Sequence, residues 1–394
     1  MAEHAGHWAL DPGIDFLNHG SFGACPRPVL EAQAELRARM ERNPVQFLAR
    51  DLESLLAAAR GALAELVGAD PDDLAFVPNA TSGVNTVVRS LEFAPGDELL
   101  TTNHAYNACA NALRAPEKRG AKVVVAQVAW PIAGPAQVID AVLAALTPRT
   151  RLALLDHVTS PTGLIFPVAE LVERLSVRGI DTVVDGAHAP GMLALDVRAT
   201  GVAYYTGNCH KWLCAPKGAA FLYVRRDRQH LVRPLTISHG ANSAREDRSR
   251  FRLEFDWTGT DDPTPFLCIP PALRFLGGLL PGGFPALMQR NRALALRARQ
   301  ILCGALGVDP PAPEAMLGSL ASVPLPDDAA ALPRTWPSSH PLQKTLLEKH
   351  RIEVPVLPFP ASPHKLVRIS AHAYNSEDQF SRLAAALQTE LPPG

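Results

Sequence analysis

The features of membrane-spanning and secreted proteins are missing from this 394-residue sequence. No stretch approaches the roughly 18–20 consecutive apolar residues of a membrane helix. The first eight residues lack the basic segment and the apolar run of a secretory signal peptide. The six cysteines are scattered, without a Cys-x-x-Cys pair, which disfavours a disulfide framework and a zinc site. We therefore expect a cytoplasmic protein with reduced thiols, no bound metal and no membrane contact.

An excess of charge of either sign is also missing. The sequence has 38 basic and 39 acidic residues, which give a formal net charge of −1 at pH 7. No overall field therefore favours binding to nucleic acid. Apolar residues make up 47% of the chain, which is enough to bury a substantial core, and we expect that core in two lobes.

Seven short apolar runs alternate with helix-like segments or short loops. The runs cover residues 74–77, 98–101, 123–128, 152–158, 182–184, 203–205 and 221–224. Strands that alternate with helices predict an α/β domain with a mainly parallel seven-stranded sheet. Ligands collect at the carboxyl ends of the strands in such a sheet.

The pattern changes after residue 265. The expected elements there are helices over about 270–280 and up to 306, a strand near 319–323, a helix over 341–350, strands over 352–357 and 365–370, and a final helix capped by Ser376. They predict a small α+β domain of residues 266–394, to which the N-terminal arm, residues 1–27, returns. Residues 28–265 then form the large domain, which opens with helices over 28–42 and 46–67.

Lys211 lies between His210 and Trp212 in a short loop after an apolar run. A lysine that is partly desolvated at a strand end has a lowered pKa and a free amine for Schiff-base chemistry. Asp185 ends the preceding apolar strand. A lysine and a carboxylate at neighbouring strand ends suit pyridoxal 5′-phosphate (PLP), because one binds C4′ and the other the pyridinium nitrogen. The alternatives are a surface lysine and a helix-capping aspartate.

Three segments resemble the class V aminotransferase family of PLP enzymes. They are TSPTGL at 159–164, VDGAHAPGM at 184–192 and GNCHKW at 207–212. The resemblance extends from residue 18 to residue 370, and within the family it is strongest to bacterial isopenicillin N epimerases. It implies the PLP-dependent transferase fold type I, a small amino-acid-type substrate, and a homodimer with a shared active site.

The resemblance also implies which residues hold the cofactor. Ala80 and Thr81 open a helix after an apolar strand and would bind the phosphate, although an ordinary N-cap has the same pattern. Asn208 and His210 would reach the same phosphate. Asp185 would pair with the pyridinium nitrogen.

The remaining cofactor contacts concern the ring and its substituents. His188 would contact O3′ of the cofactor. Ser160 stands where many relatives have an asparagine that bonds the phenolic oxygen, so the chain departs from the family pattern there. His104 would stack on the pyridine ring and could also move protons, whereas an isolated histidine is more often a solvated loop residue.

Four further residues concern the substrate and the partner subunit. Arg368 would bind the substrate α-carboxylate as a bidentate fork, with Asn18 assisting from the N-terminal arm. Tyr106 would line the pocket or simply pack. Thr260 lies in a polar turn and would reach the phosphate of the partner subunit. The alternative is an ordinary turn with no role in the site.

These residues predict a PLP-dependent enzyme that acts at Cα, with Lys211, Asp185 and His104 as catalytic residues. The overall resemblance favours an epimerase. A C–S lyase related to cysteine desulfhydrases, or an aminotransferase, is the alternative, because all three reactions use the same cofactor residues. A desulfurase is disfavoured because no cysteine follows residue 303. Loss of Lys211 or Asp185 would indicate a non-enzymatic binding protein, and both are present.

Overall fold

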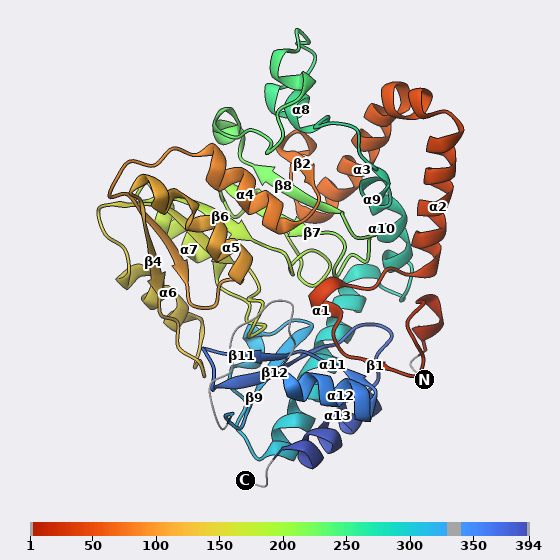
Figure 1. The fold of residues 1–394 in the computed structure, drawn as a ribbon, viewed down its shortest axis with the longest axis vertical. Coiled ribbons are helices and arrows are strands. Elements are labelled where there is room, and N and C mark those ends of the chain that lie inside the picture. Colours follow the sequence, from red (N-terminus) through yellow and green to blue (C-terminus); the bar gives the residue numbers. More distant parts are fainter. Residues whose placement is uncertain (1–2, 329–339, 392–394) are drawn as a thin grey trace.

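A computed structural model describes residues 3–328 and 340–391 of the chain (Figure 1). Its largest sheet has seven strands in the order β2-β8-β7-β6-β5-β3-β4. The strands are β2 (Leu74–Val77), β3 (Glu98–Thr102), β4 (Lys122–Ala126), β5 (Thr150–Asp156), β6 (Asp181–Asp185), β7 (Tyr204–Asn208) and β8 (Ala220–Val224). Only β8 runs antiparallel to its neighbours β7 and β2 in this sheet. The predicted α/β fold with a mainly parallel seven-stranded sheet is confirmed.

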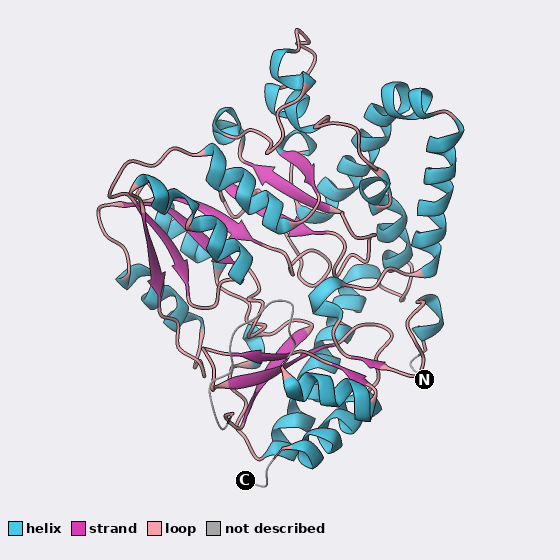
Figure 2. Cartoon of the chain, in the orientation of Figure 1, coloured by secondary structure: helices cyan, strands magenta, loops and turns pink. Residues whose placement is uncertain are grey.

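Helices cover the sheet, as Figure 2 shows. Along β5, Leu152 and Leu154 pack with α4 and α5, whereas Ala153 and Leu155 pack into the larger core with α7. Successive side chains of a strand point to opposite faces, so a strand that is apolar throughout must be covered on both. The helices of this part are α2 (Arg27–Arg42), α3 (Leu52–Val67), α4 (Ala80–Ser90), α5 (Asn107–Leu113), α6 (Pro135–Ala144), α7 (Val168–Ser176), α8 (Arg250–Phe255) and α9 (Thr264–Leu267).

The C-terminal part contains a three-stranded antiparallel sheet in the order β11-β12-β9. Its strands are β9 (Leu320–Leu325), β11 (Val356–Pro358) and β12 (Lys365–Ser370), and its helices are α10 (Ile269–Gly277), α11 (Gly283–Leu306), α12 (Pro341–His350) and α13 (Glu377–Glu390). Ser376 and Gln379 form a capping box at the start of α13. No helix within residues 3–328 and 340–391 is long and apolar enough to cross a membrane.

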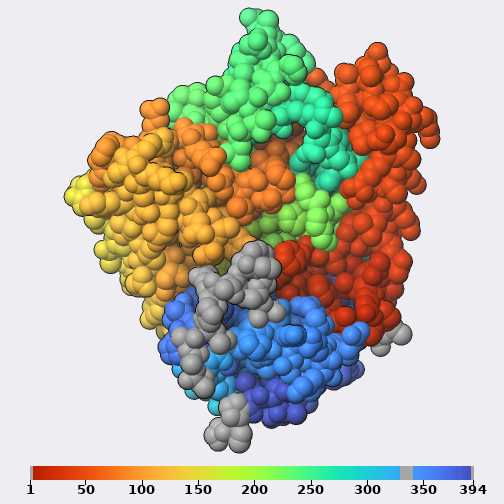
Figure 3. All heavy atoms as spheres, viewed as in Figure 1, coloured from red at the N-terminus to blue at the C-terminus, as the bar shows by residue number. Residues whose placement is uncertain are grey.

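The N-terminal arm joins the C-terminal part. Its strand β1 (Asp15–Phe16) pairs in parallel with β10 (Ile352–Glu353), and α1 (His19–Phe22) follows directly. In the space-filling view, red N-terminal residues lie between the large sheet domain and the blue C-terminal residues (Figure 3). The division into domains at residues 28 and 265 stays a prediction.

Two predicted elements differ from the structure. The strand expected over 352–357 is two strands, β10 and β11, which pair in different sheets. The change occurs at Pro355, which has no N–H to donate to a strand ladder. The helix expected over 46–67 begins with a π-helical stretch (Gln46–Asp51), in which the Gln46 side chain donates to Asp51 (2.7 Å).

Candidate active site

Lys211 lies in the loop between β7 and β8, three residues beyond the last residue of β7. Burial, followed by the positive charge of Arg368, lowers the pKa of Lys211 to about 7. The loop is closed against the N-terminal arm at Gly23, where φ is 70°. A Cβ atom added at Gly23 would lie 2.1 Å from the carbonyl oxygen of His210, so only glycine permits this approach.

The His188 side chain contacts the amine of Lys211 and influences its protonation state. Its Nδ1 accepts a hydrogen bond from the indole N–H of Trp212 (3.4 Å), and its Nε2 lies 3.2 Å from Nζ of Lys211. Because an indole N–H only donates, the neutral imidazole carries its proton on Nε2. Burial, with the charge of Lys211, holds the pKa of His188 well below its usual value. A neutral imidazole that donates to Nζ favours the free amine of Lys211.

Asp185 is the last residue of β6 and is 3% exposed. Its Oδ1 accepts from the backbone N–H of Ala187 (3.0 Å), and its Oδ2 accepts from the thiol of Cys109 (3.1 Å). An ionised carboxylate accepts about four hydrogen bonds. Asp185 therefore retains the capacity for one more donor, such as a pyridinium N–H.

The start of α4 lies beside the lysine strand. Asn79 caps the helix by accepting from the N–H of Ser82 (2.8 Å), and the N–H of Ala80 donates to the side chain of Asn208 (2.8 Å). The hydroxyl of Thr81 lies within hydrogen-bonding reach of the Cys109 thiol. The structure thus brings Ala80, Thr81 and Asn208 together at a helix N-terminus, which attracts phosphate.

Arg368, in β12, is held by residues from two other parts of the chain. Its Nη1 donates to the carbonyl (2.6 Å) and the hydroxyl (3.2 Å) of Ser160, and its Nη2 donates to the hydroxyl of Ser21 (2.9 Å). Ser21 in turn donates to Asn18 (2.5 Å). Burial lowers the pKa of Arg368 to about 10, so the guanidinium stays charged at pH 7. A fixed, charged and planar group of this kind suits a carboxylate ligand.

Residues 21–254 match the family model described as Aminotransferase class-V. The chain belongs to the class V aminotransferase family. It is 38% identical over 399 residues to isopenicillin N epimerase of Amycolatopsis lactamdurans, with 96% of each chain covered. It is 29% identical over 409 residues to an L-cysteine desulfhydrase of Arabidopsis thaliana, with 96% of this chain and 88% of that protein covered.

Solved structures of the cystine C–S lyase C-DES share the fold of this class V enzyme. The complex with the reaction product cysteine persulfide has a TM-score of 0.79 at 24% identity, with 97% and 99% of the chains covered. A mutant of C-DES with glycine covalently linked to its PLP cofactor has a TM-score of 0.78 at 23% identity, with 97% of each chain covered. The family and the fold establish a PLP-dependent enzyme of fold type I, as the sequence resemblance implied.

The residues of this class V enzyme fit PLP. Lys211 offers a partly buried amine, Asp185 offers a buried carboxylate with spare acceptor capacity, and the N-terminus of α4 lies beside Asn208 of the lysine strand. His210 fits less simply. Its Nδ1 donates to the carbonyl of Ala219 (3.0 Å), and burial with the charge of Lys211 lowers its pKa to about 4. Neutral His210 therefore has no second N–H for a phosphate.

His104, which was predicted to stack on the pyridine ring and to move protons, is enclosed by other side chains in the structure. Its Nε2 donates to the carbonyl of Val128 (3.2 Å), and its Nδ1 accepts from the hydroxyl of Thr162 (2.8 Å). Phe166 and Phe359 pack against the ring, with centroid distances of 5.8 and 4.6 Å. Burial lowers its pKa to about 4. His104 is enclosed and fully hydrogen-bonded, because its loop folds inward rather than into solvent or the pocket.

The other predicted residues are placed as follows. Tyr106, two positions after His104, is 42% exposed, and the charges of Asp185 and Arg368 act on its hydroxyl. Ser160 bonds Arg368, a contact that was predicted for neither residue. Thr260 is exposed between α8 and α9 and makes no hydrogen bond to the other predicted site residues within the described parts of the chain.

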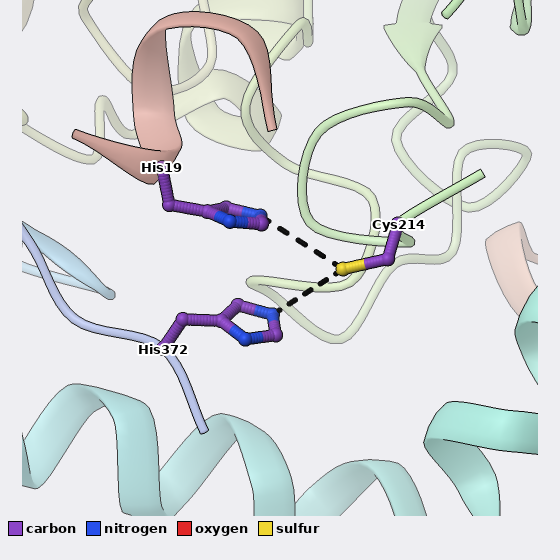
Figure 4. Close-up of side chains that lie close together, drawn as sticks. All are labelled: His19, Cys214 and His372. Carbon is purple, nitrogen blue, oxygen red and sulfur yellow. Dashed lines mark hydrogen bonds between the residues drawn. The ribbon is translucent and has the colours of Figure 1, made fainter. Parts of the chain in front are cut away.

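A buried cluster of His19, Cys214 and His372 lies against the lysine loop (Figure 4). His19 bonds the carbonyl of Lys211 through Nε2 (3.0 Å) and the hydroxyl of Tyr374 through Nδ1 (2.7 Å). The thiol of Cys214 lies 3.9 Å from Nε2 of His19 and 3.5 Å from Nε2 of His372. Because a carbonyl only accepts, His19 keeps its proton on Nε2 and offers no lone pair there to a metal. The cluster therefore connects the arm, the lysine loop and the C-terminal part.

Sequence analysis missed Asp156, Cys109, Ser21 and Trp212 as members of the site. Asp156 had a signal, because it ends an apolar run in the same way as Asp185 does. The predicted strand continued through it to residue 158, whereas β5 ends at Asp156. The other three lie in loops or at a helix start, where no periodic pattern marks them.

Proposed function

We propose that this class V enzyme epimerises a small amino-acid substrate at Cα. The observation that carries the proposal is the 38% identity to an isopenicillin N epimerase across 96% of both chains, which exceeds the 29% identity to an L-cysteine desulfhydrase. PLP, when bound, supplies an electron sink for the negative charge that proton removal leaves at Cα. The reaction type then depends on how the surrounding residues return the proton.

Three residues have roles that any reaction at Cα requires. Lys211 has a pKa of about 7 and receives the Cα proton as a free amine at neutral pH. Asp185 keeps the cofactor nitrogen protonated. Arg368 binds the α-carboxylate, and Ser21 and Ser160 fix its orientation.

Epimerisation needs a second proton carrier that faces Lys211 across the substrate, and we assign this role to Tyr106. His104 is unsuited to it, because both of its ring nitrogens are hydrogen-bonded. Tyr106 is partly exposed, so its hydroxyl exchanges protons with solvent. Burial raises the pKa of its phenol, so the group holds its proton at neutral pH.

The second candidate function is a C–S lyase. It is supported by the identity to an L-cysteine desulfhydrase and by the fold shared with a cystine C–S lyase. A lyase uses the same Lys211, Asp185 and Arg368 but expels a sulfur substituent from Cβ. An aminotransferase would instead return the proton to the cofactor.

We also propose a homodimer in the cytoplasm. The exposed position of Thr260 between α8 and α9 suits contact with a partner subunit's phosphate site. All six cysteines are free and buried, which suits a reducing compartment.

The test is a panel of L-amino acids incubated with the holoenzyme in D2O. An epimerase incorporates deuterium at Cα and forms the D-isomer, with little keto acid. Release of sulfide and pyruvate would support the lyase instead. A stoichiometric yield of keto acid would support the aminotransferase.

A further inference from the structure

Asp156 and Asp185 end neighbouring parallel strands. The register pairs Asp156 of β5 with Asp185 of β6, and each residue is 3% exposed. Adjacent strands lie about 4.8 Å apart, and residues paired in register project from the same face of the sheet. The two carboxyl groups are therefore close neighbours in a site with little water.

The surroundings of Asp156 provide hydrogen bonds but no direct cation. The backbone N–H of Tyr106 donates to its carboxyl group. No lysine or arginine within residues 3–328 and 340–391 forms an ion pair with Asp156 or Asp185. Asp156 and Asp185 face each other. The other titratable groups near them are Cys109 from α5, Tyr106 from the loop before α5, Tyr205 from β7 and Lys211 from the following loop.

Two adjacent buried carboxylates do not both ionise readily. Burial, reinforced by the charge of Asp185, raises the pKa of Asp156 well above its usual value. Asp185 has the thiol of Cys109 and the N–H of Ala187 as donors, so the negative charge rests better there. Asp156 has hydrogen bonds from backbone N–H groups only, and a neutral acid accepts those as well.

We propose that Asp156 is a positioning residue that stays protonated at neutral pH, fixes the backbone of Tyr106 beside Asp185, and leaves a single negative charge for the cofactor nitrogen. The proposal rests on the assignment of Asp185 as the PLP partner but not on epimerisation. A lyase or an aminotransferase would need the same single charge. The failure of the proposed reaction is thus distinguishable from the failure of this proposal.

The first test is infrared spectroscopy of the apoprotein at pH 7. The difference between wild type and Asp156→Asn should contain the C=O stretch of a protonated carboxylic acid, shifted in D2O. In Asp185→Asn the same band should disappear at a lower pH than in wild type, because the neighbouring charge is gone. Absence of this band from the difference between wild type and Asp156→Asn at pH 7 would overturn the proposal.

The second test is PLP affinity, measured by absorbance titration of the same apoproteins. Asparagine keeps an acceptor for the N–H of Tyr106 and is neutral, so Asp156→Asn should change the Kd by no more than about threefold. Asp185→Asn should weaken binding by more than about tenfold, since it removes a charge-assisted hydrogen bond. Equal losses in the two variants would show that the charge of Asp156 is needed, which contradicts the proposal. If Asp156→Asn does not fold, the pH titration of the wild-type band decides alone.

Discussion

Nε2 of His188 lies 3.2 Å from Nζ of Lys211, and its proton is fixed on that atom by the indole of Trp212 on the other side of the ring. Burial, the charge of Arg368 and a hydrogen bond donated by His188 all disfavour a protonated lysine. The lysine loop thus contains the group that reacts and the groups that keep it reactive at neutral pH.

Replacement of Trp212 tests this relationship. Trp212→Phe removes the N–H that fixes the tautomer of His188, so the proton is free to move to Nδ1 and Nε2 is free to accept from a lysine ammonium. We expect the pH midpoint for covalent PLP incorporation to rise from about 7 by roughly one pH unit. Trp8→Phe is the matched control, because Trp8 is equally buried and donates to Ala24 instead. Equal midpoints in wild type and Trp212→Phe would contradict the tautomer argument.

We predict that Lys211 is the attachment site of the cofactor. Reduction of the holoenzyme with borohydride should link PLP to the peptide that contains Lys211, and Lys211→Ala should lose the label. Lys217 is the control, because its amine bonds the carbonyl of Gly23 (3.0 Å) and Lys217→Ala should be labelled normally. Peptide mass spectrometry distinguishes the two sites, and a label on Lys217 would refute the assignment.

Tyr106 and His104 should differ in their effect on inversion. Tyr106→Phe removes the phenolic proton and should slow inversion by about 100-fold or more, with a smaller effect on exchange of the Cα proton. His104→Gln should leave the ratio of inversion to exchange unchanged, while it lowers the free energy of unfolding by about 1–3 kcal/mol through lost hydrogen bonds. Chiral analysis and mass spectrometry in D2O measure both rates. A larger change of that ratio in His104→Gln than in Tyr106→Phe would reverse the assignment.

Acid should destabilise the apoprotein as soon as the pH falls below 6.5. Burial lowers the pKa of His19 to about 3 and that of His104, His157 and His210 to about 4. Each of these histidines binds a proton in the unfolded chain near pH 6.5 but not in the folded one. The contribution of these histidines to stability is therefore fully present above pH 6.5 and falls by up to about 1.4 kcal/mol per pH unit per histidine between pH 6.5 and the folded pKa.

The acid dependence is measured by urea unfolding across this pH range. His157→Gln should reduce the dependence of the free energy of unfolding on pH by the contribution of one histidine. Glutamine keeps a polar side chain but does not titrate. His230→Gln is the control, since His230 is exposed. An unchanged slope in His157→Gln would contradict the prediction.

A shared active site predicts complementation between two variants with impaired activity. Lys211→Ala abolishes the reactive amine, and Thr260→Ala should weaken PLP retention in the partner subunit. A mixed dimer then has one site with both residues intact, so activity should partly return when the two variants are unfolded and refolded together. A fully active monomer in size-exclusion chromatography would exclude the shared site.

Much of the large sheet follows from the sequence because its strands are buried on both faces. Runs such as 221–224 contain only apolar residues, and turns or helices separate them. Where an apolar run continues past the end of a strand, the sequence does not show where the strand ends. Val158 continues the apolar run of β5 past Asp156, so the boundary depends on the register with β6, which the sequence does not encode locally.

The site residues also differ in how well the sequence predicts their surroundings. Lys211 and Asp185 lie at strand ends, where the sheet topology alone directs them to one edge. The environment of His104 depends on Val128, Thr162 and Phe359, which come from three distant segments. No local pattern reports that these segments enclose the ring, so the sequence alone predicts a pocket role for the loop histidine.

The hydrogen bond between His19 and Tyr374 spans 355 residues of chain. Arg368 likewise reaches Ser21 across 347 residues. The lysine loop therefore lacks its contacts with Tyr374, and Ser21 lacks Arg368, until β12 and Tyr374 have left the ribosome. Capture of the vitamin-derived cofactor in its final geometry is consequently a late event in biosynthesis, and a nascent chain that stalls before β12 would carry the reactive lysine without the means to use it.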